Sequence, residues 1–235
     1  WSILGARSDL ADGIERVEVV GQITCSGNLT SMFQGLANVR TMDLRGLRLV
    51  ASDPALGNKN PAIGVASVAD MLSGCSKVSS VRTLLQDAEL DEGTCALPAD
   101  MDTSALKTAR GMLADMDSLT DVDIAGLGKG AAGVSFTGFA AGSLTDEAGA
   151  CSLKLTDVAT GDAASLSRAF EGCTGLRRVE LTRVGGAGLN ATGAFEGCAR
   201  LASVEAASFG GARTDLTRAF AGCATDLAAN TKVEY

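Results

Sequence analysis

The sequence predicts one α/β solenoid, in which a parallel sheet of about seven to eight short strands forms one face and short helices or turns form the other. The motif Ala-Phe-x-Gly-Cys occurs three times, with its phenylalanine at Phe170, Phe195 and Phe220, each 25 residues after the one before. An alternating segment follows the first two copies, around Val179 and Val204. One such unit cannot bury its own apolar face, but stacked units cover one another.

The first half of the unit has the spacing of a helix. Leu166, Ala169, Phe170 and Cys173 fall at i, i+3, i+4 and i+7, which places them on one face of a short helix. Gly172 stands near the end of this segment, where a positive φ is often required and glycine adopts it without a Cβ clash.

The second half alternates like a strand, with Val179 and Leu181 expected to point inward and Glu180 outward. The same frame can be traced along the chain, and every centre is an aliphatic residue or methionine. The predicted strand centres are Val17, Met42, Val81, Val122, Leu153, Val179, Val204 and Val233.

The steps between these centres are unequal, and a repeat architecture accepts extra residues as loops. We therefore expect inserted loops near residues 49–66, 87–104 and 126–142. The units depart from the pattern at residues 1–13 and 224–235, which are expected to be an N-terminal and a C-terminal cap. Residues 1–235 are predicted to form a single domain, with repeats over 14–223.

Composition argues against several kinds of chemistry. The net charge of −8 disfavours a nucleic-acid partner, and no apolar run reaches the length of a membrane span. The chain has no histidine, which excludes Ser-His-Asp and Cys-His catalysis and histidine metal ligands. The seven cysteines contain no C-x-x-C pair, so a cysteine-only zinc site is not expected. We expect no enzyme activity, no catalytic residues, no metal and no cofactor.

One segment resembles a nucleotide-binding loop. Residues 128–133 read Gly-Lys-Gly-Ala-Ala-Gly, which matches G-x-G-x-x-G after a predicted strand. A dinucleotide site needs a helix to begin at once, whereas Val134 to Gly138 alternate like a strand. We therefore interpret the segment as a flexible loop between repeats.

Two columns of side chains are expected to stack inside the core. Phe33, Phe170, Phe195 and Phe220 share one slot and should be buried in register. Cys75, Cys173, Cys198 and Cys223 share another, and we expect buried, reduced thiols because free cysteine is among the most buried residue types. A bridge between neighbouring repeats is the alternative, although side chains that point the same way have poor disulfide geometry.

A row of charges is expected on the exposed face of the sheet. The residues that follow the strand centres are Glu18, Asp43, Arg82, Asp123, Lys154, Glu180, Glu205 and Glu234. Opposite charges alternate around Arg82 and Lys154, which predicts a self-neutralising middle. Glu180, Glu205 and Glu234 are left as a run of unpaired acids, relieved only by the nearby Arg177, Arg178 and Arg183. These three acids are the candidate partner-binding residues for a basic or cation-bearing partner.

The motif Met32-Phe33-Gln34-Gly35 and the Phe-x-Gly-Cys-x-x-Leu-x-x-Val-x-Leu units resemble BspA-like leucine-rich-repeat surface proteins of bacteria. The resemblance implies a right-handed leucine-rich-repeat superhelix, secretion or surface display, and adhesion to host matrix proteins or other cells. We expect a monomeric, non-enzymatic, extracellular or cell-surface interaction module of the adhesin kind. A purely structural surface spacer is the alternative, and a carboxylate-based hydrolase is a remote one.

Overall fold

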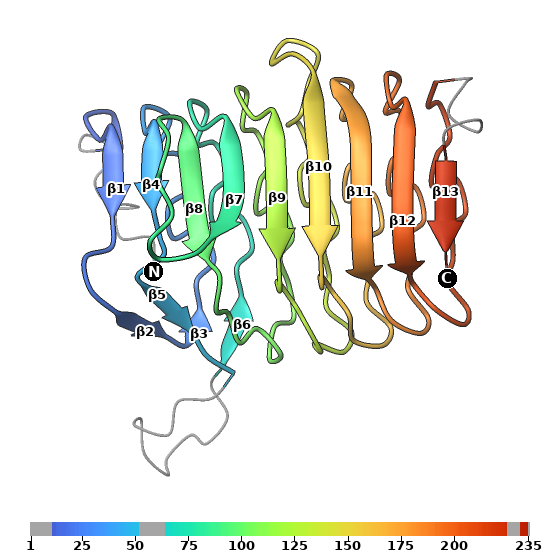
Figure 1. The fold of residues 1–235 in the computed structure, drawn as a ribbon, viewed down its shortest axis with the longest axis horizontal. Helices are drawn as coiled ribbons and strands as arrows, with labels where there is room; N and C mark the ends of the chain where they lie inside the picture. The colour runs from blue at the N-terminus through green and yellow to red at the C-terminus, as the bar shows by residue number, and fades with distance from the viewer. Residues whose placement is uncertain (1–10, 52–63, 225–230, 235) are drawn as a thin grey trace.

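The structure is a computed structural model that describes residues 11–51, 64–224 and 231–234. Its main feature is a nine-stranded sheet with the order β1-β4-β8-β7-β9-β10-β11-β12-β13, in which all neighbours are parallel (Figure 1). The large parallel sheet expected from the sequence is thus confirmed. Its strands are β1 (Arg16–Glu18), β4 (Thr41–Asp43), β8 (Thr94–Pro98), β7 (Ser80–Leu84), β9 (Asp121–Ala125), β10 (Cys151–Thr156), β11 (Leu176–Val184), β12 (Ser203–Phe209) and β13 (Thr231–Glu234).

Two small parallel sheets lie below the N-terminal strands of the main sheet (Figure 1). One joins β2 (Ile23–Cys25) to β5 (Leu47–Leu49), and the other joins β3 (Gly27–Asn28) to β6 (Val65–Ser67). The last residue of β5 and the first two residues of β6 fall within the segment 49–66 that was predicted to be a loop, and residues 52–63 of that segment lie outside the described residues.

The predicted short helices are wrong for the described residues, because residues 12–51, 64–224 and 231–234 form only strands, turns and irregular segments. Within the unit at Leu166 to Cys173, the N–H of Ala169 bonds to the carbonyl of Leu166, as in a single turn. A helix does not continue because Arg168 has φ 52 and Gly172 has φ 71, whereas a helix needs φ near −63°. The positive φ predicted for Gly172 is confirmed.

The predicted strand register is confirmed over most of the sheet. Val17 pairs with Met42, and Val81, Val122, Leu153, Val179 and Val204 pair successively across β7, β9, β10, β11 and β12. The last centre is wrong, because Val204 pairs with Thr231 and Val233 pairs with Ala206. A shift of two residues keeps the same side chains on the same face, so an alternating pattern alone does not distinguish the two registers.

The segment 87–104 contains β8, a ninth strand of the main sheet, rather than only a loop. All five residues of β8 are buried, and β8 is inserted between β4 and β7. Strand order therefore departs from sequence order at this point. The sequence Thr-Cys-Ala-Leu-Pro of β8 lacks the Leu-x-x-Val frame of the repeat, which is why the pattern did not reveal it.

The predicted loop at 126–142 is also corrected. Ser135 forms parallel bridges to Thr108 on one side and Ser165 on the other, so this segment is the back half of an ordinary repeat. Phe136, Phe139 and Ala140 are at most 1% exposed. Glycine and alanine are abundant there because the segment turns tightly against the core, as Gly128, Gly130 and Gly133 show with positive φ.

A column of polar residues runs along the back of the molecule, opposite the main sheet. It consists of Ser67, Thr108, Ser135, Ser165, Asn190 and Asp215, joined by parallel bridges, and we call it the back ladder. Each of these side chains accepts a hydrogen bond from the N–H two residues later. Such turns favour Ser, Thr, Asn and Asp, which accounts for the asparagine of the sequence Asn190-Ala191-Thr192.

The core lies between the main sheet and the back ladder. The rings of Phe170 and Phe195 stack with centroids 5.2 Å apart, and those of Phe195 and Phe220 stack at 5.5 Å. Burial of Phe33, Phe170 and Phe195 is confirmed, while Phe220 is only partly buried. Phe33 makes no ring contact with another described residue, because the next two repeats carry Leu72 and Leu113 in its slot.

The thiol column is confirmed for Cys75, Cys173 and Cys198, which are fully buried, while Cys223 is half-buried. None of the seven cysteines forms a disulfide. Cys75, Cys198 and Cys223 each direct Sγ at the carbonyl oxygen in the phenylalanine slot of the preceding repeat, at 3.3, 3.1 and 3.2 Å. The cysteines thus satisfy buried backbone acceptors, which gives them a structural role.

Candidate interaction surface

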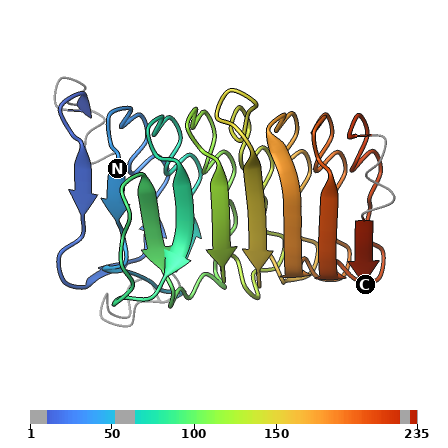
Figure 2. The ribbon, with the colours of Figure 1, turned by 45° about the horizontal axis from the view of Figure 1, so that its top comes forward.

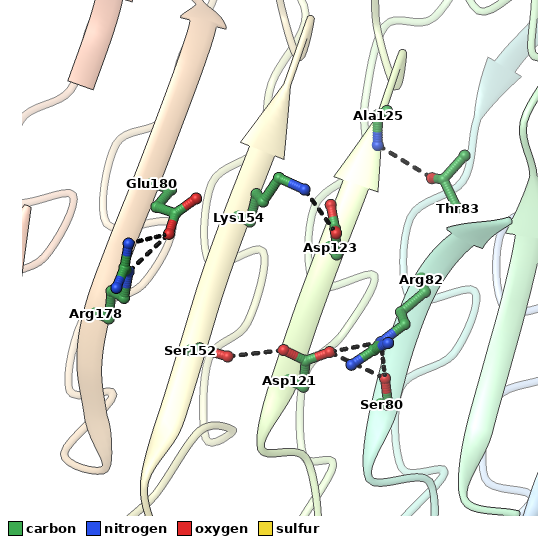
Figure 3. Close-up of polar contacts among 10 residues, drawn as sticks. All are labelled: Ser80, Arg82, Thr83, Asp121, Asp123, Ala125, Ser152, Lys154, Arg178 and Glu180. Carbon is green, nitrogen blue, oxygen red and sulfur yellow. Dashed lines mark hydrogen bonds and ion pairs between the residues drawn. The ribbon is translucent and has the colours of Figure 1, made fainter. Parts of the chain in front are cut away.

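We call the side of the main sheet that faces away from the core the outer face. One row on it follows the predicted charge column from β7 to β13. Its members are Arg82, Asp123, Lys154, Glu180, Glu205 and Lys232, paired strand by strand. The first four stand on the same side of the sheet (Figure 3). The prediction that Arg82 and Lys154 share a face with Asp123 is therefore confirmed.

Asp121 is the centre of the polar contacts on β7, β9 and β10. Its Oδ2 accepts hydrogen bonds from Nε of Arg82 at 2.7 Å and from Oγ of Ser80 at 3.2 Å. Its Oδ1 accepts a hydrogen bond from Oγ of Ser152 at 2.7 Å (Figure 3). The sequence missed Asp121 because it precedes the strand centre, although it lies two residues from Asp123 and thus on the same face.

Arg82 departs from the predicted pairing in two ways. It is bound to Asp121 rather than to Asp123, and Ala96 of β8 separates it from Asp43. Asp123 is instead paired with Lys154, whose Nζ lies 2.9 Å from Oδ2. The hydrogen bond and the charge of Asp123 raise the pKa of Lys154 above its usual value. The middle of the outer face is nevertheless neutralised by its own ion pairs.

The predicted run of three acids is wrong at its last member, because Lys232 rather than Glu234 follows Glu205 in the row, while the expected relief by Arg178 is confirmed. Glu180 and Glu205 do stand opposite each other, but Nη2 of Arg178 lies 2.6 Å from Glu180 and 3.8 Å from Glu205. The neighbour of Glu205 on β13 is Lys232, whereas Glu234 pairs with Ala207. The cause is the register of β13, whereas Arg178 lies two residues before Glu180 and on the same face, where it was expected to relieve the acids. The side chain of Glu234 lies outside the described part of the chain.

Two shallow hollows follow this row. One of about 400 Å³ is lined by Arg82, Asp121, Asp123, Lys154 and Glu180, with Ser152, Leu153 and Arg178. Another of about 170 Å³ lies beside it, where the small side chain of Ala207 leaves room between Glu180, Glu205 and Lys232. Both are open depressions rather than enclosed cavities, which suits contact with another macromolecule better than capture of a small molecule.

The N-terminal part of the outer face is arranged differently. Asp43 and Arg45 form a bidentate ion pair, with Nε to Oδ1 at 2.9 Å and Nη2 to Oδ2 at 2.7 Å. Only 9% of the Arg45 side chain and 14% of the Asp43 side chain are exposed. The hydrogen bond from Arg45 holds the pKa of Asp43 below its usual range. The sequence missed Arg45 because it follows the strand as an ordinary surface cation would.

The described residues offer little for covalent or metal chemistry. They contain no group of three or more Asp, Glu, His or Cys placed to hold a metal ion. Burial raises the pKa of Cys75 to about 12, which keeps this thiol protonated and therefore a poor nucleophile. No helix in the described part of the chain is long and apolar enough to cross a membrane.

Comparison of this chain with family models, curated proteins and solved structures finds no match.

Proposed function

We propose that the protein is a non-enzymatic interaction module of a bacterial cell surface or secreted protein, built as a leucine-rich-repeat solenoid of the BspA-like kind. The 25-residue motif, the parallel sheet and the in-register phenylalanine and cysteine columns support this assignment. In such architectures each repeat contacts only its neighbours, and the extended face of the sheet is available for binding.

The observation that carries the proposal is the exposure of charged side chains in rows on the outer face. The side chains of Arg82, Lys154 and Glu205 are 47%, 50% and 62% exposed, although each is held in place by a neighbouring strand. A rigid surface with fixed charges of both signs can select a protein partner by electrostatic complementarity. The partner class we propose is a protein of the host matrix or of another cell, and the module itself is a monomer.

A structural spacer is the second candidate, because it too has a specific observation in its favour. Each of Arg82, Asp121, Asp123 and Lys154 already has an opposite charge within the face. A spacer needs such internal pairing for stability and needs no ligand. A carboxylate-based hydrolase is a remote third proposal, and the engagement of Asp121 and Asp123 with cations does not favour it.

Binding of the purified protein to a panel of extracellular-matrix proteins separates these proposals. An interaction module should give saturable binding to at least one of them, and Lys154→Glu on the outer face should weaken it. Lys107→Glu makes the same charge change on the exposed back of the molecule and is the matched control. Absence of saturable binding across the panel would favour the spacer, and equal losses for the two variants would place the site elsewhere.

A further inference from the structure

Residues 85–93 form a segment that we call the strap. It connects the end of β7 to the start of β8 and runs along the outer side of β4. Arg45, which follows β4, donates from Nη1 to the carbonyl oxygens of Leu85 at 3.0 Å and Ala88 at 2.6 Å. Arg40, which precedes β4, pairs with Glu92 at 3.6 Å. The strap therefore passes along the whole length of β4, and it lies in front of this strand in both views (Figures 1 and 2).

The outer side chains of β8, the strand beside the strap, are covered. Ala96 of β8 occupies the same row as Arg82, yet it is fully buried, and Thr94 is 6% exposed. Ala96 is buried without belonging to the apolar core, which lies on the other side of the sheet. Farther along the row, the side chain of Arg82 is 47% exposed. The strap thus covers a part of the outer face that is open from β7 onward.

Among the described residues, the strap is anchored at its last residue, where the N–H groups of Ser79 and Ser80 donate to the carbonyl oxygen of Gly93 at 2.8 and 3.0 Å, whereas its middle is held mainly by Arg45. Its sequence, Leu-Gln-Asp-Ala-Glu-Leu-Asp-Glu-Gly, contains four acidic residues. The exposed residues of the strap include Gln86, Asp87, Glu89, Asp91 and Glu92. The ion pair of Glu92 with Arg40 joins two exposed side chains, a kind of contact that contributes little. Arg45, by contrast, is buried by its surroundings and joins Asp43 to two strap carbonyls at once.

We propose that the strap is a movable cover on the outer face and that Arg45 is its latch. With the latch closed, β4 and β8 are hidden and the interaction surface begins at β7. With the latch open, the strap swings away on Leu84 and Gly93, which has φ 86, and the rows of β4 and β8 join the surface. Segments held by few contacts open locally without unfolding of the whole protein. That the uncovered rows bind a partner rests on the proposed function, whereas the latch itself does not.

Hydrogen exchange followed by mass spectrometry tests the latch on the protein without any partner. In Arg45→Ala, the amide of Ala88, which donates to the carbonyl of Leu85 at 3.2 Å, should exchange at least tenfold faster than in the wild type, while amides of β11 and β12 should be unchanged. Arg48→Ala is the matched control, because Arg48 is an exposed arginine of the adjoining strand β5. A glutamate-specific protease should also cut at Glu89 and Glu92 faster in Arg45→Ala than in Arg48→Ala.

Arg45→Lys is a second, milder variant that keeps the test valid if Arg45→Ala does not fold. Lysine keeps the charge beside Asp43 but lacks the planar fork of donors. It should give an intermediate increase in strap exchange. Strap exchange equal to the wild type in both Arg45 variants would overturn the proposal. So would an increase shared equally by β11 and β12, since Arg45 would then support the whole fold. A protein with an intact latch and no saturable matrix partner would refute the proposed function alone.

Discussion

The Sγ atom of Cys198 lies 3.1 Å from the carbonyl oxygen of Phe170, one repeat earlier in the chain. The same position is occupied by Ser143 in the repeat before Cys173, and there Oγ donates to the carbonyl of Leu113 at 2.6 Å. In these repeats a small side chain with one donor supplies a hydrogen bond to the buried carbonyl of the preceding repeat, whereas Met116 fills the same slot after Leu113 without a donor. This hydrogen bond accounts for the polar atom that cysteine and serine place in a core that is otherwise apolar.

Ser143→Ala should lower the free energy of unfolding by about 1–3 kcal/mol, because Ser143 is fully buried and also accepts a hydrogen bond from the N–H of Met116 at 2.9 Å. Chemical denaturation of the two proteins measures the loss. Ser143→Cys keeps a weak donor in the same slot and should be the milder change. An alanine variant as stable as the wild type would show that the carbonyl of Leu113 does not need this donor.

Phe195→Ala should cost about 3–5 kcal/mol of unfolding free energy, as large-to-small core changes do. The ring of Phe195 is 1% exposed and stacks on both Phe170 and Phe220. Phe220→Ala is the matched control, and its cost should be smaller because Phe220 is only partly buried. Thermal or chemical unfolding gives both values, and the reverse order would contradict the burial seen in the structure.

The parts of the fold that the sequence predicts are those that recur. The 25-residue spacing of Phe170, Phe195 and Phe220 identifies the register of the core because each repeat must present the same side chain to its neighbour. The short helix was wrong because apolar spacing reports which residues face inward but not the sign of φ at Arg168. The back ladder had a usable signal: a Ser, Thr, Asn or Asp stands five residues before the phenylalanine slot, as Asn190 does before Phe195.

The features that occur once were not predictable from the pattern. The strand β8 and the strap interrupt the order of the repeats, and the strap is bound by Arg45, which has no counterpart in the other units. The contacts of the candidate acids were likewise not predictable in full from the pattern. Glu180 and Glu205 were placed correctly side by side, but the contribution of Arg178 depends on side-chain direction, and the neighbour Lys232 depends on a two-residue register.

Arg82→Glu should destabilise the fold by about 0.2–1 kcal/mol, because it replaces an ion pair with Asp121 by like charges next to Asp121 and Asp123. The loss should be larger at low salt, since exposed charges are screened by ions. Denaturation at two salt concentrations measures it, with Arg82→Gln as the variant that removes the pair without adding repulsion. A salt-independent loss would mean that packing of the arginine stem, rather than its charge, is what matters.

Acidification should release the strap. The hydrogen bond from Arg45 lowers the pKa of Asp43 in the folded protein from its ordinary value of 3.8. A carboxyl whose pKa is depressed by folding stabilises the folded state fully above its unfolded pKa, and the contribution disappears as pH falls through the lower folded value. The latch should therefore hold from neutral pH down to about 4 and weaken only below that. Protection of the strap, corrected for the intrinsic exchange rate, should fall in that acid range.

Asp43→Asn is the control for this acid response, because asparagine keeps the shape of the side chain but does not titrate. In this variant Arg45 loses its ionic partner at every pH, so strap exchange should already be fast at pH 7 and should change little on acidification. If the wild type and Asp43→Asn lose protection along the same pH curve, Asp43 does not control the opening.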